Sequence, residues 1–243
     1  MQKINFLGYP LCTDLRQINF NGGPMVINTL NPHSYCTAKK DKLFDEALKA
    51  SDVLVPDGIG IVWGEKMIHK NSIYKIAGYD LFEHFMNTMN VSGGTAFFLG
   101  ASNETLERIT ENAGIDFPNV EVYSYSPPYK DKFSQEDSKL MCSLANEKKP
   151  MVLFVGMTAP KQEKWVHENR HHLNAEIICS IGAVFDFYAG NVKRPSQFWI
   201  SMGLEWLLRL LKEPKRLFYR NFVSTPKFIL EVFCFKVFKK GLL

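Results

Sequence analysis

The 243-residue sequence lacks several patterns that would assign it quickly to a common class of protein. It has no run of about 20 apolar residues, so we expect no membrane-spanning helix. No charged start followed by an apolar stretch indicates a secretory signal. The five cysteines are scattered and lack the Cys/Cys or Cys/His spacing of a zinc site. We therefore expect reduced thiols and a cytoplasmic or peripheral protein.

Three familiar nucleotide- and metal-binding motifs are also missing. The sequence contains neither the GxGxxG pattern of dinucleotide-binding folds nor the GxxxxGK[ST] pattern of a P-loop. It has no Asp-x-Asp pair, with which many sugar-nucleotide transferases hold a metal ion on a diphosphate. We therefore expect no cofactor and no metal. A bound diphosphate would have to be neutralised by arginine, lysine and helix N-termini.

Positive charge, by contrast, is concentrated at one end of the chain. Residues 193–243 carry eleven Lys and Arg against three Glu, a net charge of +8, which leaves −4 on residues 1–192 because the whole chain carries +4. Such a segment predicts a polyanionic partner: nucleic acid, an anionic membrane or a diphosphate. Residues 226–240 set Phe, Ile and Val among lysines, which favours an anionic membrane and disfavours nucleic acid. A helix packed on the core is the alternative.

Short apolar runs alternate with amphipathic stretches through residues 1–192. This pattern predicts an α/β core with a doubly wound, mostly parallel, Rossmann-like sheet, followed by a helical, membrane-associating appendage at 193–243. The expected strands are 25–27, 53–55, 95–99, 120–124, 151–155 and 176–180. The expected core helices are 34–50, 59–68, 79–90, 102–112, 134–146 and 160–171, with another apolar helix at 198–211.

Four of the expected strands end in turns that contain glycine. Ligands of such folds bind beyond the carboxyl ends of the strands, where glycine lets the backbone approach closely and the next helix presents free N–H groups. Four such turns in one domain favour a site for a nucleotide or a phosphorylated sugar. The turns are Val55-Pro56-Asp57-Gly58, Leu99-Gly100-Ala101-Ser102, Val155-Gly156-Met157-Thr158 and Ser180-Ile181-Gly182-Ala183.

Several polar residues beside these turns could carry chemistry. Asp57 is well placed to act as a general base on a hydroxyl group, although an Asp that caps the next helix is the common alternative. Thr29 and Asn31 could bind a sugar or uracil, or only form an Asn-Pro turn. Asp186 could orient a sugar hydroxyl or satisfy backbone donors. Lys161 lies at the expected start of a helix, where it could hold a diphosphate.

Arginines of the basic segment are candidates for phosphate binding. Arg209, Arg216 and Arg220 are spaced by seven and four residues and can share a helix face. Guanidinium groups bind phosphates with two hydrogen bonds and stay charged when partly buried. A solvated charged face is the alternative.

Taken together, these strings resemble the WecG/TagA/CpsF family of bacterial glycosyltransferases (glycosyltransferase family 26). The likeness runs in order through nearly the whole chain. It rests on Thr29-Leu30-Asn31, Val55-Pro56-Asp57-Gly58-Ile59-Gly60, Ala77-Gly78-Tyr79-Asp80-Leu81, Phe98-Leu99-Gly100-Ala101, Tyr125-Ser126-Pro127-Pro128, Pro160-Lys161-Gln162-Glu163, Ile181-Gly182-Ala183 and Gly203-Leu204-Glu205-Trp206.

The resemblance implies an inverting, metal-independent transfer from a UDP-sugar, typically UDP-N-acetylmannosamine or its uronic acid. The implied acceptor is N-acetylglucosamine on undecaprenyl diphosphate, at the inner face of the cell membrane, in teichoic acid or surface polysaccharide synthesis. A hexose donor with a longer lipid-linked acceptor also occurs in the family. The oligomeric state stays open, with a homo-oligomer as one option. A nucleotide-binding oxidoreductase and a non-catalytic membrane-docking partner are the alternatives from other classes.

The resemblance also assigns roles to residues. Asp57 matches the catalytic aspartate, and Thr29 matches the threonine near it. The C-terminal appendage is expected to close over the pocket and to supply Arg209, Arg216 and Arg220 to the diphosphate or the lipid acceptor. The expected contacts of the UDP-sugar are Asn31, Gly58, Gly100, Gly156, Lys161, Gln162, Glu163, Gly182 and Asp186.

Overall fold

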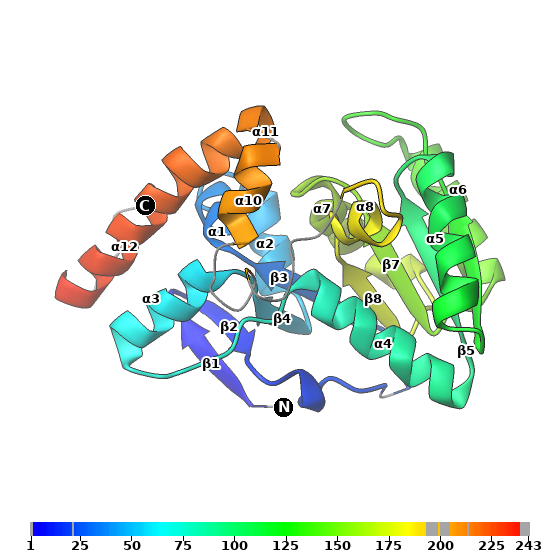
Figure 1. The fold of residues 1–243 in the computed structure, drawn as a ribbon, viewed down its shortest axis with the longest axis horizontal. Helices are drawn as coiled ribbons and strands as arrows, with labels where there is room; N and C mark the ends of the chain where they lie inside the picture. The colour runs from blue at the N-terminus through cyan, green and yellow to red at the C-terminus, as the bar shows by residue number, and fades with distance from the viewer. Residues whose placement is uncertain (1, 21, 193–198, 200–204, 213, 239–243) are drawn as a thin grey trace.

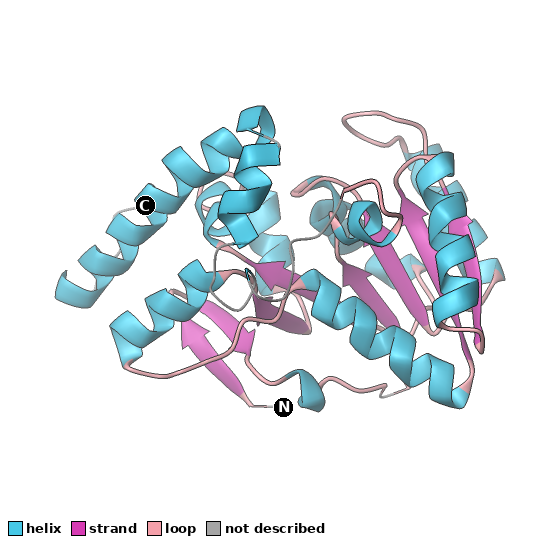
Figure 2. Ribbon diagram, viewed as in Figure 1, coloured by secondary structure: helices cyan, strands magenta, loops and turns pink. Residues whose placement is uncertain are grey.

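The computed structural model describes residues 2–20, 22–192, 199, 205–212 and 214–238. Its core is an eight-stranded sheet with helices on both faces (Figures 1 and 2). The first two strands pair antiparallel, and the other neighbouring strands pair parallel. In spatial order the strands are β1 (Lys3–Phe6), β2 (Tyr9–Cys12), β4 (Val53–Pro56), β3 (Met25–Leu30), β8 (Ile177–Ser180), β7 (Val152–Gly156), β5 (Gly94–Gly100) and β6 (Val120–Tyr125). The predicted doubly wound, mostly parallel fold is confirmed.

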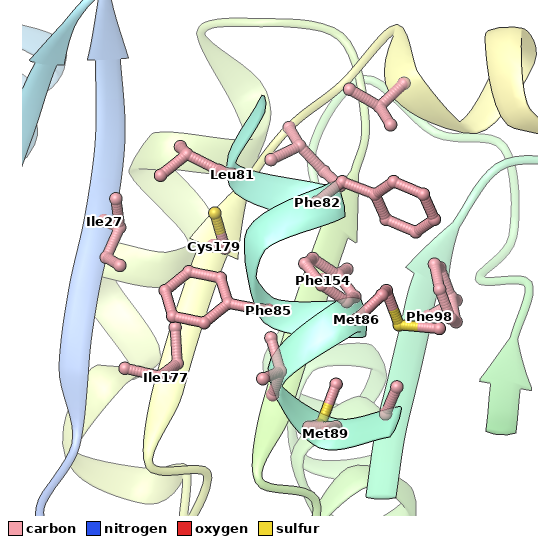
Figure 3. Packing of buried hydrophobic residues seen from close by; sticks show 14 of the residues in the cluster. Ile27, Leu81, Phe82, Phe85, Met86, Met89, Phe98, Phe154, Ile177 and Cys179 are labelled. Atoms are coloured by element: carbon pink, nitrogen blue, oxygen red, sulfur yellow. The ribbon is translucent and has the colours of Figure 1, made fainter. Parts of the chain in front are cut away.

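One face of the sheet is covered by α4 (Gly78–Ser92), α5 (Asn103–Asp116) and α8 (Val184–Tyr188). Apolar residues recur along α4 every three or four positions, so they form one stripe that faces the strands. Figure 3 shows this stripe against side chains of β3, β8, β7 and β5. The stripe is made by Leu81, Phe82, Phe85, Met86 and Met89, each at most 1% exposed.

The opposite face is covered by α1 (Pro32–Ala38), α2 (Lys42–Lys49), α6 (Gln135–Glu147) and α7 (Lys161–Asn169). Alternate residues of each strand point to this side, as the pleat of a strand requires. Val26 and Ile178 pack here against Trp165 and Val166 of α7, whereas Ile27, next to Val26, belongs to the cluster on the other face. The core therefore has two apolar layers, one on each side of the sheet.

Two details of the core differ from the sequence prediction. The single helix expected at 34–50 is wrong: α1 and α2 are separate helices, and Asp41 begins the second by accepting a hydrogen bond from the backbone N–H of Phe44. The β1–β2 hairpin was not predicted. Its turn uses Gly8, at a φ of +88°, whose N–H donates to the side chain of Asn5. Lys3 and Asn5 interrupt the first strand and Pro10 the second, so neither is a continuous apolar run like the one that marks β8.

The C-terminal segment consists of helices, as predicted. They are α10 (Glu205–Lys212), α11 (Pro214–Tyr219), a five-residue π-helical stretch η3 (Arg220–Ser224) and α12 (Thr225–Phe238). The predicted domain boundary at residue 193 and the first half of the helix expected at 198–211 lie outside the described residues, apart from Trp199. Within the described residues, no helix is long and apolar enough to cross a membrane.

The last helix, α12, packs beside α3 (Ile59–His69), which follows β4 (Figure 1). Two glycines of α3 make this close packing possible. On the side of α12, a Cβ atom on Gly60 would lie 3.8 Å from the ring of Phe228, and one on Gly64 would lie 3.3 Å from Val232. Phe228 and Val232 are both fully buried in this contact. One stripe of α12 is therefore part of the core, as the alternative interpretation predicted.

Candidate active site

The predicted site residues of the core lie along one edge of the sheet. Asp57, Thr29, Gly182, Gly156 and Gly100 lie at or next to the carboxyl ends of β4, β3, β8, β7 and β5. These five strands are consecutive neighbours and parallel, so their carboxyl ends meet along one edge. This is the edge at which doubly wound folds bind their ligands.

Asp57 is half-buried and directly follows the last residue of β4. Its backbone N–H donates a 2.8 Å hydrogen bond to the carbonyl of Leu30, so β3 holds it in place. Gly58, at a φ of +86°, is the residue that caps α3. The N-cap position of α3 is thus held by Gly58 and not by Asp57, and the role of Asp57 as a general base stays a prediction. The carboxylate is held where two strands end, as a general base would be.

Thr29 and Asn31 lie on either side of the end of β3. Thr29 is half-buried and pairs in register with Val55, two residues before Asp57. Asn31 caps α1: its Oδ1 accepts hydrogen bonds from the N–H groups of His33 and Ser34, at 3.0 and 2.9 Å. The turn-forming role of Asn31 is thus confirmed. Its contact with a sugar or uracil stays a prediction.

Gly100 and Gly156 are buried beneath the edge and are needed for packing. A Cβ atom on Gly100 would lie 2.3 Å from the carbonyl oxygen of Gly156, and one on Gly156 would lie 2.5 Å from the ring of Phe185. Any larger residue would push apart β5, β7 and α8. Protein atoms already occupy the space beside both glycines, so no ligand can bind there. A ligand at this edge could contact only the backbone of the turns that follow the two glycines.

Gln162 and Glu163 lie below two turns of the site, and only 4% and 3% of their surfaces are exposed. Gln162 Nε2 donates to Glu163 Oε1 at 2.8 Å, and Gln162 Oε1 accepts from the N–H of Met157 at 3.1 Å. Burial raises the pKa of Glu163 to about 7. A Cβ atom on Gly182, whose φ is +43°, would lie 3.4 Å from Gln162 Oε1. The pair therefore connects the turns after β7 and β8.

Lys161 begins α7, as predicted, but its ammonium group is used within the protein. It donates to the carbonyl of Lys130 and lies 3.9 Å from the ring centre of Phe133. Burial lowers its pKa. These contacts fasten the loop after β6 to the start of α7, beside a cleft of about 310 Å³ that Lys132, Lys164 and Trp165 also line. Its predicted contact with a diphosphate stays a prediction.

Asp186 is half-buried on α8, and its surroundings include polar residues that the sequence did not single out. Asn191 Nδ2 donates to Thr105 Oγ1 at 2.8 Å and lies 3.5 Å from Asp186 Oδ1. Arg108 donates to Asn191 Oδ1 at 3.2 Å. A cation, an amide and a hydroxyl thus gather near Asp186. The only sequence signal for them was the Gly190-Asn191 turn.

The start of α4 also reaches this edge. A Cβ atom on Gly78 would lie 3.3 Å from Val184 and 3.4 Å from Ile181, so glycine lets α4 begin directly against the turn after β8. Asp80 accepts a 2.7 Å hydrogen bond from the N–H of Ala77 and caps the helix. Two motifs about 100 residues apart in the sequence therefore build one wall of the site.

The structure describes the three predicted arginines of the appendage in different detail. Arg209 and Arg216 lie on α10 and α11, and their side chains are outside the described part of the structure. Arg220 is half-buried at the start of η3. Burial, and next the charge of Arg220, lower the pKa of His33. Since His33 follows Asn31 by two residues, Arg220 lies near the carboxyl end of β3.

A second contact ties the appendage to the same place. His33 Nδ1 lies 2.8 Å from Ser224 Oγ, and the thiol of Cys36 donates to the carbonyl of Ser224. The ring of His33 also meets that of Tyr219 edge-on, with 6.3 Å between the ring centres. The appendage is therefore fastened to α1, the helix that Asn31 caps. Among the described residues, no three His, Cys, Asp or Glu side chains gather as a metal site would require.

The family model of the WecG/TagA/CpsF glycosyl transferases matches residues 10–241. The chain belongs to this family. Relatives in three bacteria carry the name N-acetylglucosaminyldiphosphoundecaprenol N-acetyl-beta-D-mannosaminyltransferase. The Bacillus spizizenii protein is 33% identical over 87% of this chain and 79% of its own length. The Bacillus subtilis protein is 31% identical over 85% and 78%, and the Staphylococcus aureus protein is 26% identical over 79% and 74%.

Family membership makes this WecG/TagA/CpsF member a glycosyltransferase. It decides against the two alternatives from other classes, a nucleotide-binding oxidoreductase and a non-catalytic docking partner. The match extends through α10, α11 and α12, so the C-terminal helices belong to the part of the chain that the family model covers.

Proposed function

We propose that this protein transfers N-acetylmannosamine from UDP to an N-acetylglucosamine carried on undecaprenyl diphosphate, with inversion at the anomeric carbon and without a metal ion. The observation that carries the proposal is the position of Asp57 at the carboxyl end of β4, beside Thr29 and close to the glycine turns after β7 and β8. The names of the relatives support the acceptor and the transferred sugar.

In the proposed reaction, Asp57 takes the proton of the acceptor hydroxyl as its oxygen attacks the anomeric carbon. The new glycosidic C–O bond forms on the face opposite the nucleotide, while the C–O bond to the β-phosphate breaks and its electron pair leaves with UDP. The proton passes from Asp57 to solvent. General-base assistance of this kind contributes about 10²–10⁴-fold in rate. Thr29 lies on the neighbouring strand and would orient the sugar or the acceptor.

The charge of the departing UDP would be neutralised by the protein's own groups. Arg220 begins η3, whose last residue, Ser224, contacts His33 at the start of α1, directly after β3. Arg209 and Arg216 belong to the two helices before it. The start of α7 lies next to the turn after β7 and carries the partial positive charge of a helix N-terminus, which would attract an anion. We propose that these groups take the place of the divalent cation used by many other glycosyltransferases.

The appendage would bring the enzyme to its lipid acceptor at the inner face of the cell membrane. Large apolar side chains of α11, η3 and α12 face outwards, and lysines lie among them. Phenylalanine at a membrane interface and lysine near anionic lipid both favour such binding. The exposed side chains that would enter the interface are Phe218, Tyr219, Phe222, Ile229, Leu230, Phe233, Val237 and Phe238, which are 44–72% exposed.

The test is UDP release from a panel of UDP-sugars in EDTA, with and without a short-chain polyprenyl-diphosphate N-acetylglucosamine acceptor. Release from UDP-N-acetylmannosamine that requires the acceptor is the expected result, with the product's anomeric configuration read by NMR. Acceptor-dependent release from a UDP-hexose instead would move the donor to the other class known in the family. A requirement for added divalent metal, or a retained configuration, would contradict the mechanism.

A further inference from the structure

Among the described residues, three buried side-chain atoms have no hydrogen-bond partner: Asn28 Oδ1, Glu163 Oε2 and Ser180 Oγ. Each belongs to a side chain that is at most 3% exposed. Buried polar atoms without partners are rare in folded proteins because each costs about 1–3 kcal/mol. Three of them in one protein call for an explanation.

The three groups lie in the same layer of the protein. Asn28 follows Ile27 on β3 and Ser180 follows Cys179 on β8, and Ile27 pairs in register with Cys179. Asn28 and Ser180 are therefore adjacent on neighbouring strands, and both point to the face that α7 covers, because side chains alternate along a strand. Glu163 comes from α7 itself and is buried toward that face. The result is a polar spot in an otherwise apolar layer, directly beneath the carboxyl edge.

Gln162 connects this polar spot to the turns above it. Its amide nitrogen donates to Glu163 Oε1, and its amide oxygen accepts from the N–H of Met157 in the turn after β7. Both ends of the amide also lie close to Gly182 in the turn after β8, where a Cβ atom would be 3.4 Å from the oxygen and 3.6 Å from the nitrogen. The side chain of Glu163 thus determines where the amide of Gln162 lies, and that amide contacts both turns.

We propose that Glu163 is a positioning residue that acts as a neutral acid: it holds Gln162, and through it the turns after β7 and β8, in the arrangement that binds the donor. When Glu163 loses its proton, donor binding weakens. This inference rests on the proposed function and on the expected contacts of the UDP-sugar with the turns at Gly156 and Gly182. It departs from the sequence prediction, which gave Glu163 a direct contact with the UDP-sugar.

The surroundings of Glu163 favour its neutral form. On this face β3, β7 and β8 offer only uncharged side chains, among them Val26, Asn28, Val155 and Ser180. From α2, Asp41 is paired with Lys164 at 2.7 Å, so neither charge of that pair is uncompensated. Lys161 points to the loop after β6, as described above, and Asp45 is paired with Lys49.

Burial without a compensating cation explains why the pKa of Glu163 rises to about 7. An anion at this position would lie close to the diphosphate of the donor, and like charges repel strongly where little water separates them. Ionisation would also leave a charged oxygen without a partner in an apolar layer. Both effects act against the donor-bound arrangement, so UDP affinity should fall as the pH rises through about 7.

The test is the Kd of UDP, measured by calorimetry from pH 5.5 to 8.5 for the wild type, Glu163→Gln and, as a matched control on the same helix, Glu168→Gln, whose carboxylate is exposed. The terminal phosphate of UDP has a pKa near 6 and titrates for all three proteins. The informative quantity is therefore the difference between variants. Wild type and Glu168→Gln should lose at least about fivefold in affinity relative to Glu163→Gln between pH 6 and 8.5.

Glu163→Gln keeps an acceptor for Gln162 and cannot ionise, so its Kd should stay close to the wild-type value at pH 6. Gln162→Ala removes the connection and should weaken UDP binding at every pH. Identical pH profiles for wild type and Glu163→Gln would overturn the inference. So would loss of binding by Glu163→Gln at every pH, because the carboxylate would then be needed as such. Failure of the wild type to bind UDP at any pH would instead overturn the proposed function.

Discussion

The carboxyl edge of the core and the C-terminal helices use apolar residues in opposite ways. In the core, β3, β4, β7 and β8 bury nearly every side chain, and the polar groups of the site lie only where these strands end. Along α12, Phe228 and Val232 are fully buried, whereas Phe233 and Phe238 are 54% and 72% exposed. Helices cover both faces of the core sheet, whereas only one side of α12 is covered by protein.

This difference shows how one chain can hold a rigid site and also present a surface to a membrane. The spacing of four between Phe228 and Val232 matches that between Gly60 and Gly64 on α3, so a single stripe is enough to dock α12. The remaining apolar residues of α12 are not needed for that contact. They remain exposed and could insert into the membrane that carries the proposed lipid acceptor.

The largest effect should follow from changing the carboxyl edge itself. Asp57→Asn removes the proposed base and keeps the size of the side chain, so turnover should fall by about 10²–10⁴-fold while the Kd of UDP changes little. Acceptor-dependent UDP release and calorimetry measure the two quantities. Glu111→Gln, on the exposed side of α5, is the control and should retain activity. Turnover of Asp57→Asn within about threefold of wild type would remove Asp57 from this role.

The two sides of α12 should differ next most strongly. Phe228→Ala empties a fully buried position between α12, α3 and α1 and should lower the free energy of unfolding by about 3–5 kcal/mol. Phe238→Ala, at an exposed position of the same helix, should change it by less than about 0.5 kcal/mol. Urea denaturation measures both. Equal effects of the two changes would mean that α12 does not dock by the stripe described here.

A moderate effect is expected for membrane binding. Replacing both Phe233 and Phe238 by Ser removes two aromatic side chains from the exposed side of α12 and should weaken binding to anionic vesicles by about tenfold or more. Turnover on a water-soluble acceptor should be unaffected. The matched control replaces Val91 and Ile115, which are 90% and 79% exposed on the core. Vesicle sedimentation should show that only the first double variant loses binding.

The smallest effect is expected at His33, where the C-terminal helices contact the core. Burial and the charge of Arg220 lower the pKa of His33, so the folded protein favours the neutral ring, whereas the unfolded chain takes up a proton below about pH 6.5. The stabilising contribution of neutral His33 is therefore complete above that pH and is lost as the pH falls. His33→Gln should reduce the drop in unfolding temperature between pH 7.5 and 5.5. An unchanged or larger drop would contradict this assignment.

The sheet and the position of Asp57 could be predicted from the sequence because their signals are local. Apolar runs followed at once by Asp or Gly mark buried parallel strands and the turns after them, and this holds for β4, β7 and β8. The hairpin at the start of the chain and the break near Asp41 were missed. Lys3, Asn5 and Pro10 interrupt the hairpin strands, and the break depends on a single capping side chain, so neither feature is marked by a continuous apolar run.

The roles of individual glycines and acids could be predicted less well, because they depend on contacts between distant segments. Gly100 and Gly156 lack side chains so that strands and Phe185 can pack, which no local pattern reveals. Glu163 was predicted to contact the UDP-sugar and is instead buried, with 3% of its surface exposed. The grouping of Thr105, Arg108 and Asn191 around Asp186 joins α5 to the end of α8 across more than 80 residues.

The most direct test of the account is a crystal structure of the enzyme with UDP bound. The account predicts that the diphosphate lies at the carboxyl edge, between the end of β4 and the turn containing Gly182, with the side chain of Asp57 facing the space that the sugar would occupy. UDP bound instead in the cleft between Lys132, Lys164 and Trp165, away from Asp57, would contradict the assignment of the active site.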